Sequence, residues 1–106
     1  MKIQRQRDTL IVYPQGELDH HSAQAMREEL DARIGDEQIR RLVFDMRDLT
    51  FMESSGIGVL IGRYKIIARR GGSVCVRNMS PQVDKLFTLS GLHRIIEKNC
   101  QGGDQR

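Results

Sequence analysis

The sequence predicts one α/β domain with a mixed β-sheet, for three reasons. Short apolar runs typical of strands alternate with longer segments of helical periodicity, the pattern of strands joined by crossover helices. A length of 106 residues leaves room for one domain only. Apolar residues make up 39% of the chain, which is enough to build one core. The predicted order is ββαβαβαβ, with about five strands and three or more helices.

The first half predicts two strands, a helix and a central strand. Residues 3–7 form an edge strand and residues 10–13 a second strand, which Pro14 and Gly16 end. The helix shows apolar spacing of i, i+3, i+7 and i+11, with Asp19 or Ser22 as its cap and Gly35 at its end, and its apolar positions are Ala23, Met26, Leu30 and Ile34. Residues 42–46 are almost continuously apolar, which places this strand at the sheet centre.

The second half predicts two helices and two short strands. Ser54 or Ser55 caps a second helix that ends at Gly71 and Gly72, and residues 73–77 follow as a strand. A third helix opens with Ser80 and Pro81 and closes at Gly91. Residues 94–96 form the last strand. The folded domain is therefore expected over residues 1–99, with a flexible tail over residues 100–106.

The charge pattern predicts a solvated surface rather than a nucleic-acid interface. Seventeen Lys and Arg against 14 Asp and Glu leave a net charge of +3, with both signs scattered along the chain. Aromatic residues make up 5%, which offers few stacking surfaces for bases. We therefore assign the basic residues of the second helix to a solvated face, and these are Arg63, Lys65, Arg69 and Arg70.

Cysteine usage and hydropathy predict a cytoplasmic protein. Cys75 and Cys100 have neither the number nor the spacing of a disulfide framework or a zinc site, so reduced thiols are expected. No apolar stretch approaches the ~20 residues that a membrane span needs. The basic N-terminus has no apolar segment behind it, so it does not resemble a signal peptide.

The segment 51–62 is the most informative part of the chain. Ser54 and Ser55 lie where a predicted helix begins, and a helix N-terminus favours an anion through its dipole and its free N–H groups. The alternative is that one serine simply caps the helix. Capping does not explain Gly56, Gly58 and Gly62, each of which costs roughly 1 kcal/mol relative to alanine inside a helix. Close packing on the sheet, or the close approach of a partner, would require them.

Several enzyme and metal sites are disfavoured. The glycine spacing is not that of a nucleotide-binding loop, and a Gly-x-Ser-x-Gly nucleophile motif is absent. Residues 17–21 combine two carboxylates with His20 and His21, but adjacent histidines point in different directions, so we favour a capping Asp19 and no metal. Asp45, at the end of an apolar strand, is interpreted as a solvated strand end rather than a phosphoacceptor.

Four ordered segments together resemble a known family. They are Gly-Glu-Leu-Asp-His-His at 16–21, Asp-Leu-Thr-Phe-Met-Glu-Ser-Ser-Gly-Ile-Gly-Val at 48–59, Gly-Arg-Tyr-Lys at 62–65, and the segment 80–92. In this order and spacing they resemble the STAS-domain anti-sigma factor antagonists over roughly residues 1–99. Within that family the chain is most similar to the sporulation members, the anti-sigma F factor antagonists. The resemblance implies the STAS-domain fold.

The family resemblance also implies a regulatory role without catalysis or cofactor. The serine that the family phosphorylates corresponds to Ser54, and Glu53 precedes it where relatives usually have Asp. The unphosphorylated protein, a monomer when free, would bind an anti-sigma factor that is also a serine kinase and so release the sigma factor. A PP2C-type phosphatase would reverse the phosphorylation. The implied partner-binding residues are Asp19, Glu53, Ser54, Ser55, Gly56 and Gly58.

The chain departs from the family pattern at residues 101–106, and a second function is possible for a protein with this resemblance. Relatives usually continue into a final amphipathic helix, whereas residues 101–106 are polar and rich in glycine. The alternative function is that of a STAS-type module that binds a nucleotide or a small anion. A shift of melting temperature with GTP or ATP, in the absence of any kinase, would favour that alternative.

Overall fold

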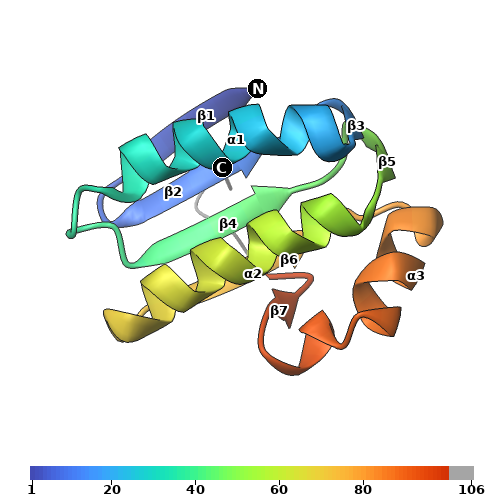
Figure 1. Cartoon of the computed structure of the whole chain (residues 1–106). Coiled ribbons are helices and arrows are strands. Elements are labelled where there is room, and N and C mark those ends of the chain that lie inside the picture. The colour runs from blue at the N-terminus through green and yellow to red at the C-terminus, as the bar shows by residue number, and fades with distance from the viewer. Residues whose placement is uncertain (101–106) are drawn as a thin grey trace.

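The computed structural model describes residues 1–100, which form a five-stranded sheet, a two-stranded sheet and three α-helices. The strands of the larger sheet lie in the order β1-β2-β4-β6-β7 (Figure 1). They are β1 (Lys2–Gln6), β2 (Thr9–Tyr13), β4 (Arg41–Asp45), β6 (Ser73–Arg77) and β7 (Glu97–Lys98). The pair β1 and β2 is antiparallel and all other neighbours are parallel, so the sheet is mixed and β4 is central, as predicted.

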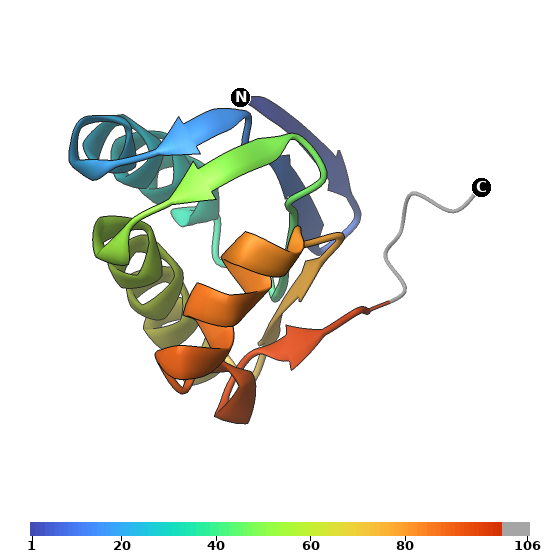
Figure 2. The same ribbon diagram turned by 90° about the vertical axis from the view of Figure 1, so that its right-hand side faces the viewer.

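The helices α1 (His20–Ile34) and α2 (Ser54–Arg69) cover one face of the larger sheet, and α3 (Pro81–Leu89) lies beside the end near β6 and β7 (Figures 1 and 2). Most of the core fills the space between the helices and the sheet, and its largest fully buried side chains include Phe44, Phe87 and Leu30. A second, smaller cluster lies on the opposite face and consists of Ile11, Val43, Cys75 and Cys100, with Tyr13 against it.

The helix ends follow the predicted signals, with one exception. Asp19 caps α1 and Ser80 caps α3, and Pro81 is the first residue of α3. The prediction that Ser54 or Ser55 caps α2 is wrong, because the N-cap is Glu53, whose backbone is extended and whose carbonyl accepts a hydrogen bond from the N–H of Gly56 at 2.9 Å. Ser54 is therefore the first residue inside the helix.

Two strands were missed by the predicted order ββαβαβαβ. These are β3 (Gly16–Leu18) and β5 (Leu49–Met52), which pair in parallel as the second sheet. The predicted strand 94–96 is also displaced, because residues Leu92–Arg94 form a 3-10 helix after Gly91, whose φ of 84° reverses the chain, and the strand begins at Glu97.

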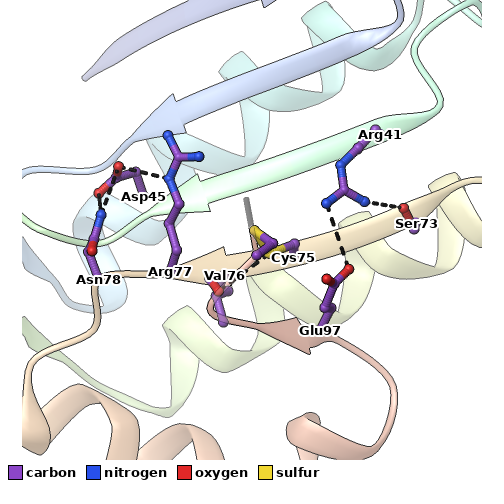
Figure 3. The surroundings of a disulfide bond; sticks show 9 residues. Arg41, Asp45, Ser73, Cys75, Val76, Arg77, Asn78 and Glu97 are labelled. Atoms are coloured by element: carbon purple, nitrogen blue, oxygen red, sulfur yellow. Dashed lines mark hydrogen bonds and ion pairs between the residues drawn. A yellow bond between two sulfur atoms is a disulfide. The ribbon is translucent and has the colours of Figure 1, made fainter. Parts of the chain in front are cut away.

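The two cysteines are not the reduced thiols that the sequence predicted. A disulfide joins Cys75 to Cys100 with a Cα–Cα distance of 6.1 Å (Figure 3). The chain folds back after β7 and so brings together two thiols that are 25 residues apart. Cys100, assigned to the flexible tail, is buried, and the rest of that predicted tail lies outside the described residues.

Asp45 is not the solvated strand end that the sequence suggested. Its side chain is fully buried and accepts hydrogen bonds from Arg47. It also accepts from Arg77 and Asn78 (Figure 3). Burial by itself would raise the pKa of this carboxyl, but the hydrogen bonds from Arg47, Asn78 and Arg77 outweigh burial and lower the pKa to about 2. Asp45 therefore ties together the ends of β4 and β6.

Candidate functional site

The small sheet of β3 and β5 brings two helix N-termini to the same edge of the molecule. Because the strands are parallel, their carboxyl ends meet, and the N–H of Glu53 donates to the carbonyl of Leu18 at 3.0 Å. α1 begins two residues after Leu18, and α2 begins directly after Glu53. The starts of both helices therefore lie side by side (Figure 1). Asp19 and Glu53, which are distant in sequence, occupy the N-cap positions of neighbouring helices.

Asp19 is fixed by a reciprocal set of hydrogen bonds at the start of α1. Its Oδ1 accepts from the Ser22 N–H at 2.9 Å, and the Asp19 N–H donates to the Ser22 hydroxyl oxygen at 2.9 Å. The bond from the Ser22 backbone is the main cause that lowers the pKa of Asp19, and the Ser22 hydroxyl adds to it. Asp19 thus carries a negative charge in a fixed orientation at the surface of this edge, and one of its two predicted roles, helix capping, is confirmed.

Ser54 lies at the exposed first position of α2. Glu53, next to it, is also exposed, and its side chain makes no capping hydrogen bond. The first N–H groups of a helix have no partner within the helix, and its dipole leaves partial positive charge there. A phosphoryl group on the Ser54 hydroxyl would therefore stand at a position that favours an anion.

Ser55 differs from Ser54 in its surroundings. Its residue is only partly exposed, and its hydroxyl oxygen is buried with no hydrogen-bond partner within the described part of the chain. A hydroxyl in this orientation is less accessible to a modifying enzyme than that of Ser54. The structure thus separates the two adjacent serines by accessibility.

The glycines of α2 divide into one packed position and two open ones. A Cβ atom at Gly56 would lie 2.6 Å from Cγ of Met52 and 2.9 Å from Cδ2 of Leu18, so this glycine lets the helix start rest on β3 and β5. Cβ atoms at Gly58 and Gly62 would meet nothing within 4 Å. Of the two expected reasons for these glycines, packing on the sheet holds for Gly56 but not for Gly58 and Gly62, for which the close approach of a partner stays a prediction.

Phe51 adds an apolar element that sequence reasoning did not assign to the site. It lies on β5, two residues before Glu53, and 41% of its surface is exposed. Together with Met52, Gln82 and Val83 it lines a small pocket between β5 and α3. The signal was present in the sequence as an aromatic residue close to the Glu-Ser-Ser segment, but its exposure depends on β5, a strand that the sequence pattern did not predict.

Two cavities lie along α1, and Ser54 lines neither of them. One of about 290 Å³ lies between β3 and α1, and its lining includes Glu17 and Glu29 but no lysine or arginine. A shallower one of about 320 Å³ lies on α1 beside His20, His21 and Glu28. Within residues 1–100, no group of three His, Cys, Asp or Glu side chains is placed to hold a metal ion.

The sequence predicted that the basic residues of the second helix lie on a solvated face. This prediction is wrong for some of them. Arg63 is buried, and its Nε lies 3.1 Å from Oδ1 of Asp31 on α1. The Arg70 guanidinium donates to the carbonyls of Ile34 at 2.6 Å and Ile39 at 3.0 Å, so it closes the C-terminal end of α1. Both arginines hold the two helices together. No helix within the described residues is long and apolar enough to cross a membrane.

Comparison with known proteins agrees with this arrangement. The family model described as "STAS domain" matches residues 1–102. The anti-sigma F factor antagonist of Paenibacillus polymyxa is 40% identical over 96 residues, which cover 91% of this chain and 82% of that protein. The anti-sigma-B factor antagonist of Bacillus subtilis (strain 168) is 36% identical over 92 residues, covering 85% of this chain and 83% of that protein.

Solved structures of the anti-sigma factor antagonist SpoIIAA have the same fold. Its unphosphorylated form superposes with a TM-score of 0.83 and 29% identity, covering 94% of this chain and 88% of that chain. The phosphorylated form of the Bacillus protein gives 0.75 and 28% identity, covering 94% of this chain and 91% of that chain. The similarity spans the whole of the α/β domain described above.

Proposed function

The chain belongs to the STAS domain family, among regulatory proteins rather than enzymes, and we propose that it is an anti-sigma factor antagonist switched by phosphorylation of Ser54. In the unphosphorylated form it binds an anti-sigma factor and so frees a sigma factor. The observation that carries the proposal is the exposed Ser54 at the start of α2, beside the acidic Asp19 and Glu53.

The contact surface for the anti-sigma factor is the edge at which α1 and α2 begin. Asp19, Glu53 and the open backbone at Gly58 would meet the partner directly, and Phe51 supplies an apolar anchor at its rim. Ser54 and Ser55 lie in the middle of this surface, while Gly56 holds it against β3 and β5. These residues are the proposed partner-binding set.

The enzyme that phosphorylates Ser54 is proposed to be the anti-sigma factor itself, acting as a serine kinase, and a PP2C-type phosphatase would restore the active form. The chain would thus be a substrate and a ligand, a monomer when free and cytoplasmic, where sigma factors act. We place it on the sporulation branch, since the anti-sigma F factor antagonist of Paenibacillus polymyxa is more similar than the anti-sigma-B factor antagonist of Bacillus subtilis.

Phosphorylation would change the partner surface more than the fold. A phosphoserine adds about −1.5 to −2 charges at pH 7. Within the protein, this charge at the start of α2 is favourable by roughly 0.3–1 kcal/mol. Against the partner it adds to the negative charges of Asp19 and Glu53, and burying an imperfectly paired dianion costs several kcal/mol. Binding should therefore weaken by at least about tenfold, since 1.4 kcal/mol is a factor of ten.

The test is a kinase reaction with the cognate anti-sigma factor and ATP, followed by mapping of the modified residue and titration of binding. We expect phosphate on Ser54 alone. Ser54→Ala should bind the anti-sigma factor and accept no phosphate, and Ser54→Asp should bind at least about tenfold more weakly while melting close to the parent protein. Ser55→Ala is the matched control and should still be phosphorylated. Phosphate on Ser55 or Thr50, with Ser54 unmodified, would contradict the proposal.

A second measurement distinguishes this function from a nucleotide-binding module. The isolated chain is heated with and without GTP or ATP, in the absence of kinase. An antagonist that acts by protein binding should show the same melting temperature in each case. A rise that grows with nucleotide concentration would instead support a ligand-binding STAS module.

A further inference from the structure

The face of the larger sheet that α1 and α2 leave open carries its own apolar cluster. Ile11 and Val43 are fully buried there, on neighbouring strands, and Cys75 lies beside Val43 in the middle of β6. Cys100 packs onto this cluster and is bonded to Cys75 (Figure 3). The described chain thus returns, at its last residue, to the centre of the sheet.

The segment that carries Cys100 has few other ties to the sheet. β7 consists of two residues, Glu97 and Lys98, paired with Cys75 and Val76. The N–H of Asn99 donates to the carbonyl of Val76 at 2.8 Å, and Asn99 has a φ of 57°, a left-handed conformation that asparagine tolerates and that turns the chain toward β6. A strand this short is weakly held by its own pairing.

The ion pairs of β7 are also weak. Glu97 lies 3.7 Å from Arg41, and Lys98 lies 2.8 Å from Asp84 (Figure 3 shows the first pair). All four side chains are partly exposed, and ion pairs of this kind contribute little to stability. Ile96, which precedes this segment, is buried in the core, so the disulfide acts as a covalent restraint on residues 97–100 beside weak non-covalent ones.

We propose that Cys75 and Cys100 form a redox-responsive clasp, whose reduction by a dithiol frees residues 97–100 and uncovers the edge of β6. This rests on the proposed function in one respect: a regulator that meets sigma factors works in the cytosol, where disulfides are rare and usually serve reversible roles. In the oxidised protein the disulfide holds β7 in place. In the reduced protein β7 is held by its two residue pairs with β6 and by weak ion pairs.

The reaction is thiol–disulfide exchange with a dithiol reductant. A thiolate of the reductant attacks Sγ of Cys100, the less buried of the two residues, and the Cys75 sulfur leaves as a thiolate and takes up a proton. The second thiol of the reductant then attacks the mixed disulfide and releases Cys100. Two electrons and two protons pass to the protein, and the reductant ends as its own disulfide.

Release would change the surface at two places. The backbone groups of Cys75 and Val76 that pair with β7 would become an open strand edge, which can pair with another chain. The loop between the cysteines, which are 25 positions apart and enclose α3, would lose its covalent closure. Redox state would thus set how firmly the α3 side of the domain is held.

The experiment uses the isolated chain, purified in air and treated with dithiothreitol without denaturant. Alkylation and intact-mass measurement count free thiols, and amide hydrogen exchange reports on residues 97–99. We expect no free thiol before treatment and two after it, in a protein that stays folded. The Asn99 amide should exchange at least about tenfold faster after reduction. The melting temperature should fall by about 10 °C or more.

Cys100→Ser provides the matched control, because it removes the bond at the less buried end of the pair. This variant should show the fast exchange of the reduced protein at all times and no response to dithiothreitol. A double Cys75→Ala and Cys100→Ala variant serves the same purpose if the single variant does not fold.

Three results would overturn the clasp. The first is that air-purified protein has two free thiols that a mild oxidant does not join. The second is that dithiothreitol reduces the disulfide only in denaturant. The third is that amide hydrogen exchange at residues 97–99 does not change on reduction. No partner or kinase enters these measurements. Failure of the clasp therefore leaves the Ser54 switch untouched, and failure of the Ser54 switch leaves these results standing.

Discussion

The N–H of Glu53 donates to the carbonyl of Leu18 at 3.0 Å, and this one bond joins the residues that lead into α2 and α1. It closes the pairing of β3 with β5 and fixes the distance between the two helix starts. The geometry of the candidate site therefore depends on a sheet of only two strands. Substitutions that move the two-stranded sheet should therefore disturb the candidate site before they disturb the five-stranded sheet.

Gly56→Ala should destabilise the protein, although alanine favours a helix. Its Cβ would lie 2.6 Å from Cγ of Met52 and 2.9 Å from Cδ2 of Leu18, so one of these side chains must shift. Overpacking of this kind costs typically 1–3 kcal/mol, which exceeds the gain in helix propensity of about 1 kcal/mol. Denaturant unfolding of the two proteins measures the difference.

Gly58→Ala is the matched control for that change, since a Cβ at Gly58 meets nothing within 4 Å. It should stabilise the isolated protein by up to about 1 kcal/mol. Binding to the anti-sigma factor should nevertheless weaken if the open side of Gly58 faces the partner. A Gly58→Ala protein that binds normally would remove this residue from the proposed surface. A Gly56→Ala protein as stable as the parent protein would contradict the packing argument.

Asp19→Asn should separate the two roles of this residue. Asparagine is about as good an N-cap as aspartate, so stability should change by well under about 1 kcal/mol. Loss of the negative charge should still weaken binding to the anti-sigma factor. Ser22→Ala removes the other half of the cap and should lower stability with little effect on binding. Equal binding by Asp19→Asn and the parent protein would limit Asp19 to capping.

The sequence predicted the central strand and the helices well, because these are long segments with clear periodicity or caps, such as Asp19 and Ser80. It missed β3 and β5 because strands of three and four residues show no period of their own. Their pairing, which places Asp19 beside Glu53, is a tertiary contact between segments distant in sequence. The burial of Asp45 and the meeting of Cys75 with Cys100 depend on such contacts too, and no local pattern encodes them.

Asp45 should make stability depend on pH in the acid range. Its pKa of about 2 in the folded protein lies below its ordinary value of 3.8, so the folded state favours the carboxylate. Its contribution is complete above about pH 4 and is lost as the pH falls toward 2, and the difference corresponds to about 2 kcal/mol. Unfolding free energies measured between pH 5 and 2 test this.

Asp45→Asn is the variant that assigns this dependence. It keeps the shape but leaves Arg77 buried without its counter-charge, so stability at pH 7 should fall by about 2–4 kcal/mol. The loss between pH 4 and pH 2 should become smaller by about the contribution of Asp45. Glu37→Gln, at an exposed position, should leave the profile unchanged. An Asp45→Asn protein with the acid dependence of the parent would show that other carboxyls cause it.

Arg63 on α2 and Asp31 on α1 form an ion pair whose loss on one side should lower the free energy of unfolding. The reason is that the buried arginine would then lack a counter-charge. Burial is the main cause that lowers the pKa of Arg63, and Asp31 opposes that effect with its charge. Asp31→Asn would leave a buried guanidinium without a counter-charge, at a cost of about 1–3 kcal/mol because Asp31 itself is partly exposed. Arg63→Met fills the same space without charge and should stay within about 1 kcal/mol of the parent. In the Arg63→Met background, Asp31→Asn should then have almost no effect, which a double-mutant cycle in denaturant measures. If Asp31→Asn were equally costly with and without Arg63, the pair would not be what joins the two helices.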